Sequence, residues 1–209
     1  MITELVRDPQ PYFQERIKYP RLRYQTLIVV LVGLAANAWN VSLFFTLGAA
    51  ARYVESALLL LTAIGIIEFV AWWVVLTGVM QIIANVLGGD ANYGRLLRLT
   101  GYGFLPMIVS GAIWSVTYFV SLQGLSPPDP PEVNSFEYTY QSYSQFLDQT
   151  AGDPVLLAGI AVGSLFILGS GYLWLRGVSV AADLGDERAG AAAGAAVLIL
   201  LARVFIPIV

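Results

Sequence analysis

Five long apolar stretches fill most of the chain, and polar residues are concentrated in the segments between them. A helix needs about 20 apolar residues to cross the hydrocarbon core of a bilayer. Lipid offers no hydrogen-bond partner to the backbone, so each stretch is expected to be helical. The pattern predicts an all-α polytopic membrane protein, a bundle of five transmembrane helices. The predicted spans are residues 26–51, 56–79, 101–122, 154–175 and 189–209.

The second stretch is longer than a membrane crossing requires. It runs from residue 56 to residue 87, which corresponds to about 48 Å of helix. We expect the span to end near Val79 and the helix to extend to residue 87 at the cytoplasmic interface. Gly88 and Gly89 are then expected to end the helix.

The first 25 residues are too few to fold alone. They are predicted to form a cytoplasmic or interfacial segment ahead of a single five-helix domain, residues 26–209. One interpretation places Tyr12, Phe13 and Tyr19 at the membrane surface as anchors. The alternative, weighted equally, is a simple cytoplasmic tether.

Composition lowers the expectation of an enzyme. Hydrophobic residues make up 57% of the chain and charged residues 12%, about half of the roughly 25% found in soluble proteins. The chain has no cysteine and no histidine, the residues most used for thiol chemistry, metal binding and acid–base catalysis. We expect no catalytic residue, no metal and no cofactor, and with a net charge of −3 no nucleic-acid partner. The scarcity of lysine fits a salt-loving source and GC-rich coding equally well.

The distribution of basic residues predicts the orientation, because Lys- and Arg-rich loops stay in the cytoplasm. A cytoplasmic amino terminus places nine of the eleven basic residues inside. The loop of residues 123–153 has five carboxylates and no basic residue, and is expected outside. The carboxyl terminus would then lie outside, and a prokaryotic source would place the protein in the plasma membrane.

Glu68 is the most informative single residue, because it lies near the middle of the second apolar stretch. A charge at that depth costs about 3 kcal/mol by insertion scales, so such residues usually face the bundle interior. Glu68 is either a proton- or ion-responsive site or a structural hydrogen-bonding residue. Arg203 could pair with it, but snorkelling of Arg203 to the outer surface is the favoured prediction. Further intramembrane polar candidates are Asn37, Asn40, Gln81 and Asn85, and for the asparagines packing between helices is favoured over a substrate path.

Two pairs of glycines have the spacing that lets helix backbones approach closely. They are Gly159 with Gly163 and Gly190 with Gly194. We expect the fourth and fifth spans to pack together through them, or to pack against a second copy of the chain.

A short motif precedes the third span. The segment 87–106 reads LGGDANYGRLLRLTGYGFLP and contains Gly101, Tyr102 and Pro106 in a Gly-Tyr-x-x-x-Pro arrangement. Gly101 is expected to allow a tight turn before the helix, Tyr102 to lie at the membrane interface, and Pro106 to occupy the first turns of the span.

This motif, together with the proline- and aromatic-bearing start of the chain at residues 8–16, resembles the Yip-domain (Ypt-interacting protein) family. The resemblance extends over residues 8–206 and implies five spans with a cytoplasmic amino terminus. It also implies a role in membrane trafficking, which eukaryotic members perform with Rab-type GTPases. The short amino-terminal segment argues against a GTPase partner here.

The leading hypothesis is a non-enzymatic adaptor or membrane-organising protein that contacts itself or another membrane protein within the bilayer. The alternative is a small transporter, channel or lipid-moving protein that uses Glu68 as its intramembrane site.

Overall fold

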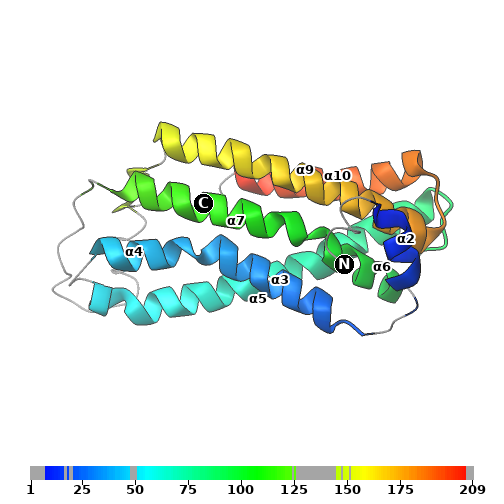
Figure 1. Cartoon of the computed structure of the whole chain (residues 1–209), viewed down its shortest axis with the longest axis horizontal. Coiled ribbons are helices and arrows are strands. Elements are labelled where there is room, and N and C mark those ends of the chain that lie inside the picture. Colours follow the sequence, from blue (N-terminus) through cyan, green and yellow to red (C-terminus); the bar gives the residue numbers. More distant parts are fainter. Residues whose placement is uncertain are drawn as a thin grey trace.

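The computed structural model describes residues 8–16, 18, 21–47, 51–123, 125, 145–146, 148–150 and 152–205. All longer elements in these ranges are helices, which run roughly along one axis (Figure 1). They are α2 (Pro9–Arg16), α3 (Arg23–Asn37), α4 (Trp39–Leu47), α5 (Ala51–Val86), α6 (Tyr93–Gly103), α7 (Leu105–Leu122), α9 (Pro154–Ala182) and α10 (Asp186–Phe205).

Four helical stretches are long and apolar enough to cross a membrane. They are Arg23–Leu47, Glu55–Val86, Leu105–Leu122 and Pro154–Ala182. The chain is therefore a multi-pass membrane protein. The fifth predicted span corresponds to α10, which begins with the charged residues Asp186, Glu187 and Arg188, and residues 206–209 lie outside the described ranges. A fifth crossing remains a prediction.

The first span is broken where the sequence predicted one continuous helix. Ala38 separates α3 from α4. The amide Nδ2 of Asn37 donates to the carbonyl of Gly33 at 2.8 Å, an acceptor that a regular helix reserves for the backbone N–H of residue 37. Asn37 thus competes with the helix at the point where it breaks.

The second helix runs without interruption from Ala51 to Val86, past the predicted membrane boundary near Val79. Gly88 then adopts a φ of +87°, and the N–H of Gly89 donates to the carbonyl of Ala84 at 2.9 Å. This left-handed ending is tolerated best by glycine. The predicted stop at Gly88 and Gly89 is confirmed.

The segment before the third span is itself a helix, α6, and it contains Gly101, which corrects the expectation of a tight turn at that residue. Asn92 caps α6 by accepting from the N–H of Arg95. Phe104 separates α6 from α7, and Pro106 lies in the first turn of α7 as predicted. A proline in the middle of a helix would remove a backbone donor and clash with the preceding turn, so Pro106 favours this break.

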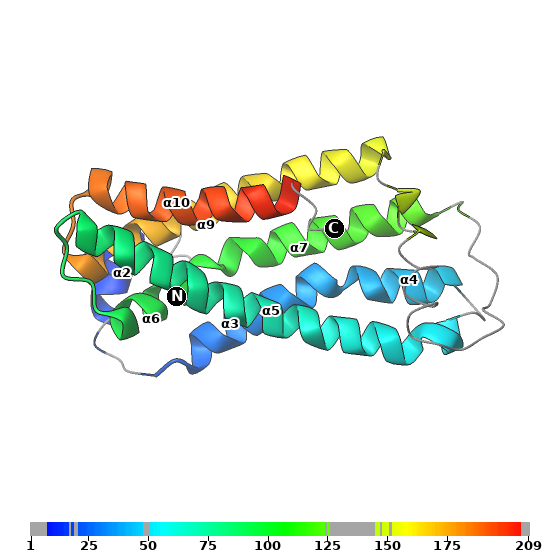
Figure 2. The ribbon, with the colours of Figure 1, turned by 180° about the vertical axis from the view of Figure 1, so that it is seen from behind.

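The long helices form a closed ring, in which each helix packs against the next. Contacts run from α5 to α3, α3 to α7, α7 to α9, α9 to α10 and α10 back to α5. We call the end with α2 and α6 the proximal end, and the end with Leu47, Leu122 and Pro154 the distal end. Viewed from behind, α10 starts at the proximal end and stops well short of the distal end of α9 (Figure 2).

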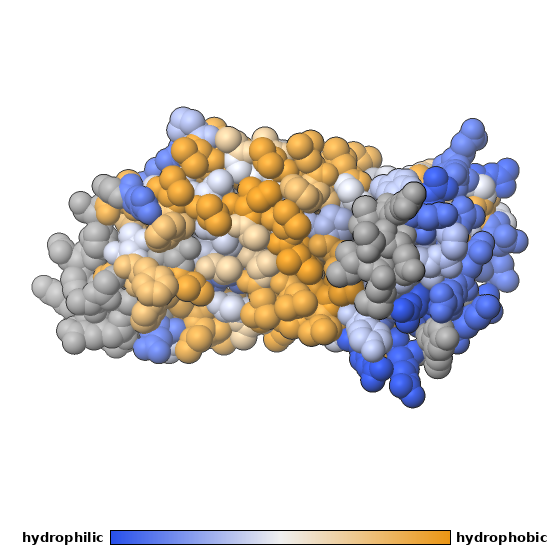
Figure 3. Space-filling view, viewed as in Figure 1, coloured by the Kyte–Doolittle hydropathy of each residue, from blue (hydrophilic) through white to orange (hydrophobic). Residues whose placement is uncertain are grey.

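The surface matches this division. On the face shown in Figure 3, an apolar band crosses the middle of the bundle, and hydrophilic residues gather at the proximal end. Large exposed apolar residues come from several helices, among them Leu27, Ile67, Ile82, Val116 and Leu165. Side chains of this kind are expected where a helix faces lipid.

Candidate functional site

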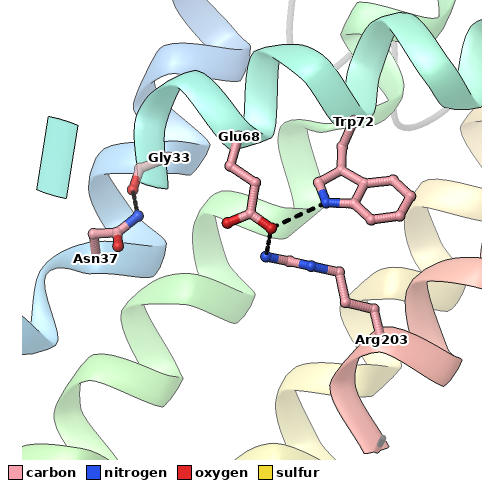
Figure 4. A network of polar contacts seen from close by, with 5 residues as sticks. All are labelled: Gly33, Asn37, Glu68, Trp72 and Arg203. Carbon is pink, nitrogen blue, oxygen red and sulfur yellow. Dashed lines mark hydrogen bonds and ion pairs between the residues drawn. The ribbon is translucent and has the colours of Figure 1, made fainter. Parts of the chain in front are cut away.

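Glu68 and Arg203 form an ion pair that joins two apolar helices, α5 and α10 (Figure 4). Glu68 projects from the middle of α5, and Arg203 from the last turn of α10, so that Nη2 of Arg203 meets Oε1 of Glu68. The prediction that Arg203 snorkels to the outer surface was wrong. The helix α10 packs directly against α5, and this contact lets the long arginine side chain reach the carboxylate.

Aromatic side chains hold the pair in place. Nε1 of Trp72 donates to the same Oε1 of Glu68 at 3.2 Å. The guanidinium carbon of Arg203 lies 5.6 Å from the ring centroids of both Trp72 and Phe69, within the range of cation–π attraction. Glu68 therefore has one oxygen engaged twice, while Oε2 points away from the arginine (Figure 4).

The pair borders a cavity of about 500 Å³. The side chains of Glu68 and Arg203 remain 43% and 26% exposed, so the pair is reachable from outside the protein. The rest of the lining is largely aromatic and aliphatic: Trp114 and Tyr118 of α7, Ile160 of α9 and Val204 of α10. This volume is in the usual range for small-molecule sites, about 300–1,000 Å³.

The other polar candidates make contacts elsewhere. Asn37 bonds within its own helix (Figure 4), and Nδ2 of Asn40 donates to Oγ1 of Thr62 on α5 at 2.9 Å. Gln81 donates to the carbonyl of Ala91, and Asn85 accepts from the N–H of the same residue. Gln81 and Asn85 thus anchor the loop between α5 and α6 and do not join the cavity.

A second cluster lies at the proximal end, where α6 carries the glycines of the sequence motif. Gly101 lies against Gln25 and the indole of Trp73, and Gly103 lies against the indole of Trp174. Any Cβ at either glycine would overlap these side chains. Gly101 therefore provides close packing within a helix, not the turn that the sequence suggested.

Hydrogen bonds fix the two indoles to α6. Nε1 of Trp174 donates to the carbonyl of Thr100 at 2.8 Å, and Nε1 of Trp73 donates to the carbonyl of Leu97 at 3.1 Å. The hydroxyls of Thr77 and Thr100 lie 2.8 Å apart. This network joins α5, α6 and α9 through buried polar groups.

Tyr102 was predicted to lie at the membrane interface. The structure instead buries it against the amino-terminal helix α2. Its ring meets the edge of Tyr12 with centroids 5.4 Å apart, and Phe13 lies beside it, completely buried. Burial raises the pKa of Tyr102, and the nearby Tyr12 hydroxyl is the second cause of this shift. The phenol therefore stays neutral. Tyr12 and Phe13 are consequently part of the protein core and not membrane anchors; Tyr19 lies outside the described residues.

The first pair of glycines contacts a different helix from the one predicted. Gly159 lies against Thr117, and Gly163 lies against the indole of Trp114, so both serve the contact of α9 with α7. Gly190 lies near Leu175 of α9, as predicted, whereas no other element among the described residues lies within 4 Å of the place where a Cβ of Gly194 would stand. The close approach of α9 to α10 instead uses Gly171, which faces Val197.

Sequence reasoning missed Trp114 and Tyr118, which line the cavity, and Trp72, which binds Glu68. Trp72 lies four residues after Glu68, the spacing at which helical side chains meet, so this contact had a detectable signal. Trp114 and Tyr118 share one face of α7, but only the packing of α7 between α3 and α9 shows which face lines the cavity at Glu68.

The described residues contain no group of three or more His, Cys, Asp or Glu side chains placed to hold a metal ion. What the cavity offers is a carboxylate, a guanidinium and aromatic rings at membrane depth. Such groups can bind a polar or zwitterionic molecule, or exchange partners in response to one.

Comparisons with known proteins complete the description of the site. A family model described as the Yip1 domain matches residues 3–206, nearly the whole chain. An uncharacterized protein of Methanocaldococcus jannaschii is 42% identical over 41 residues, which cover 20% of this chain and 29% of that protein. The chain therefore spans under a third of the length of that relative. No solved structure matches.

Proposed function

Because the chain belongs to the Yip1 domain family, we propose that it is a non-enzymatic membrane protein that organises membranes or acts as an adaptor through helix–helix contacts within the bilayer. In this proposal α10 is the fifth crossing. The amino terminus is cytoplasmic, the carboxyl terminus is external and the protein resides in the plasma membrane of a prokaryotic cell. The partner is a second copy or another membrane protein, and no GTPase is required.

The observation that carries this proposal is the small-residue face of α10. Among the described residues, no other element lies within 4 Å of a Cβ position at Gly194. Ala191 is exposed one turn before it, and Leu198 is exposed one turn after it. Small residues on a lipid-facing helix allow another helix to come close, which is how membrane helices associate. Gly159 and Gly163 already pack against α7 inside the bundle, so they are not available to contact a partner helix.

Packing at the proximal end supports an adaptor over a transporter. Trp174, Phe104, Leu99, Leu96 and Met80 are all completely buried there. The cavity at Glu68 lies distal to this layer, so a transported species would have to cross close-packed side chains. Interiors packed to this density leave few voids as large as a water molecule.

The proposal is tested by crosslinking from α10, which is simple in a chain without native cysteine. Gly194→Cys in native membranes, treated with a short bifunctional maleimide, is expected to give a dimer band or a band shifted by one partner. Val75→Cys, a 52% exposed position on α5, serves as the lipid-facing control. Equal yields from the two positions would count against α10 as the contact face.

A second candidate function is favoured by one observation, the cavity at the ion pair. A transporter, channel or lipid-moving protein would use Glu68 as its intramembrane site, and its flux would be lost in Glu68→Gln. An adaptor would tolerate that substitution.

A further inference from the structure

The exposed face of α9 changes from apolar to polar toward the proximal end. Leu165 and Leu168 are exposed, and the exposed Tyr172 follows one turn later. The guanidinium carbon of Arg176 then lies 5.5 Å from the ring centroid of Tyr172. Tyrosine next to a basic residue is typical of the level at which a membrane helix passes from hydrocarbon to headgroups. This level of α9 therefore marks the proximal edge of the apolar surface.

The start of α3 shows the same change. Arg23 and Tyr24 are both exposed, and Nη2 of the arginine donates to the tyrosine hydroxyl at 3.0 Å. The exposed Leu27 and Leu31 follow toward the distal end. A paired tyrosine and arginine thus mark the proximal edge of the apolar surface on α3 as well as on α9.

The helix α6 lies at this edge. The carbonyl of Thr100 accepts from the indole of Trp174 at 2.8 Å, and Gly101 packs against Gln25. Trp174 and Gln25 are each within one turn of the exposed tyrosine on their own helices. These contacts bring α6 to the level at which α3 and α9 leave the apolar surface.

Two arginines of α6 lack a partner. Arg95 and Arg98 are one turn apart, so they lie on the same side of the helix. Neither has a carboxylate within salt-bridge distance among the described residues, whereas Arg176 pairs with Asp186 at 2.7 Å. Nε of Arg98 is buried without a hydrogen-bond partner, while its two terminal nitrogens are neither buried nor hydrogen-bonded within the described part of the chain. The stem of Arg98 is thus packed against the protein, and the tip of its guanidinium has free donors.

We propose that Arg95 and Arg98 bind the phosphate-bearing headgroup of an anionic membrane lipid at the proximal edge of the apolar surface. Guanidinium donors match phosphate oxygens in geometry and charge, and basic residues beside a bilayer attract anionic lipids. The inference goes beyond the proposed adaptor function and does not depend on it.

The surroundings of α6 fit a lipid in its normal orientation. In the first turn of α6, the hydroxyl of Tyr93 donates to the carbonyl of Val74 on α5 at 3.0 Å. From the exposed Val74, the exposed Ile67 lies about two turns further toward the distal end. On α3, the exposed Leu27 is likewise distal to the edge. Lipid chains can therefore contact these helices toward the middle of the bilayer while the headgroup reaches the arginines, and a soluble phosphate would gain nothing from this apolar surface.

The test measures lipid binding to the purified full chain in dodecyl maltoside, a detergent without phosphate. Dioleoyl phosphatidylglycerol is titrated, and bound lipid is counted by native mass spectrometry. Dioleoyl phosphatidylcholine provides the same chains and a phosphate without net charge, dioleoylglycerol provides the chains alone, and inorganic phosphate provides the anion alone. We expect saturable binding of phosphatidylglycerol, at least 5-fold tighter than that of either uncharged lipid.

Substitutions then assign the site. Arg98→Gln and Arg95→Gln should each weaken phosphatidylglycerol binding about 5-fold, the effect expected of one basic side chain at an anionic membrane surface. Arg176→Gln is the matched control, because it removes a positive charge near the same edge that is already paired with Asp186. It should leave the affinity unchanged. Arg95 is exposed, so Arg95→Gln carries the test if Arg98→Gln does not fold.

Four results would overturn the proposal. One is unchanged affinity in folded Arg98→Gln or, where that variant does not fold, in Arg95→Gln. An equal loss in Arg176→Gln would mean that only the net charge of the protein matters. Equal binding of phosphatidylcholine or dioleoylglycerol would mean that the lipid charge is not recognised. Displacement of phosphatidylglycerol by inorganic phosphate at the same concentration would indicate a site for a soluble anion.

Discussion

Tryptophan and glycine meet in pairs at the proximal end of the bundle. Trp73 of α5 lies over Gly101, and Trp174 of α9 lies over Gly103. Each indole also donates a hydrogen bond to a backbone carbonyl of α6. Gly101 and Gly103 are two residues apart, so both indoles pack against one short helix. Each of these contacts requires that the glycine has no side chain.

Gly103→Ala tests this pairing. The new Cβ would overlap the indole of Trp174, which is completely buried, and overpacking of a close-packed site costs about 1–3 kcal/mol. We expect a lower thermal unfolding temperature in detergent. Gly78→Ala is the matched control, since nothing lies within 4 Å of its Cβ position; it should be neutral or slightly stabilising. An unchanged unfolding temperature in Gly103→Ala would show that α6 can move away from Trp174 at no cost.

At the scale of single elements, α2 is a small helix attached to the bundle by two aromatic side chains. Phe13 is completely buried and Tyr12 is nearly so, and α2 packs against α9. Its polar residues Gln14 and Glu15 are exposed. The attachment is thus confined to one face of an eight-residue helix, which is too short to be stable in isolation.

Phe13→Ala should release α2 from the bundle. Loss of a buried phenylalanine costs about 3–5 kcal/mol in a core, more than a short helix gains from its remaining contacts. Trypsin is then expected to cleave after Arg16 and Lys18 at least 10-fold faster than in the wild type. Gln14→Ala, at an exposed position on the same helix, should leave the rate unchanged. If the two variants are cleaved equally slowly, Phe13 does not hold α2.

The sequence predicted the long helices well and their interruptions poorly. The apolar stretches indicated helices because lipid leaves the backbone no other partner, and Gly88 marked a helix end by its conformational freedom. The break at Ala38 depends on the hydrogen bond from Asn37 to Gly33, and the helix α6 lies in a segment that hydropathy represents as a polar link. These features arise from single contacts that periodicity does not record.

The candidate site was predicted in part, for a similar reason. Glu68 was recognisable as a charge within an apolar stretch, but its pairing with Arg203 depends on how α10 packs along α5. The sequence pattern predicts how deep in the membrane a residue lies along its helix. It does not predict how the helix is tilted or which helix packs beside it. The same limit explains why Gly159 and Gly163 were predicted to contact the fifth span or a second copy, when they face α7.

At the scale of the whole molecule, the hydrophilic proximal end and the apolar band define the position in the membrane (Figure 3). Arg95, Arg98, Arg176 and Arg188 all belong to α6 or to the region where α9 and α10 meet. The positive-inside rule then predicts that the proximal end is cytoplasmic.

Labelling of single cysteines tests this orientation. Gln149→Cys near the distal end and Glu187→Cys at the proximal end are both exposed positions, and the chain has no native cysteine. In intact spheroplasts a membrane-impermeant maleimide is expected to label Gln149→Cys alone. Both variants should react after detergent is added. Labelling of Glu187→Cys before lysis would mean that the orientation is reversed.

The central claim, that the protein acts through contacts within the bilayer and does not transport, is tested most directly by flux. Purified wild type and Glu68→Gln are placed in proteoliposomes, and movement of protons, sodium and a fluorescent lipid is followed. The account predicts no movement above empty vesicles for either protein, because packed side chains at the proximal end separate the cavity from the cytoplasm. Movement supported by the wild type and lost in Glu68→Gln would contradict it and make Glu68 a transport residue.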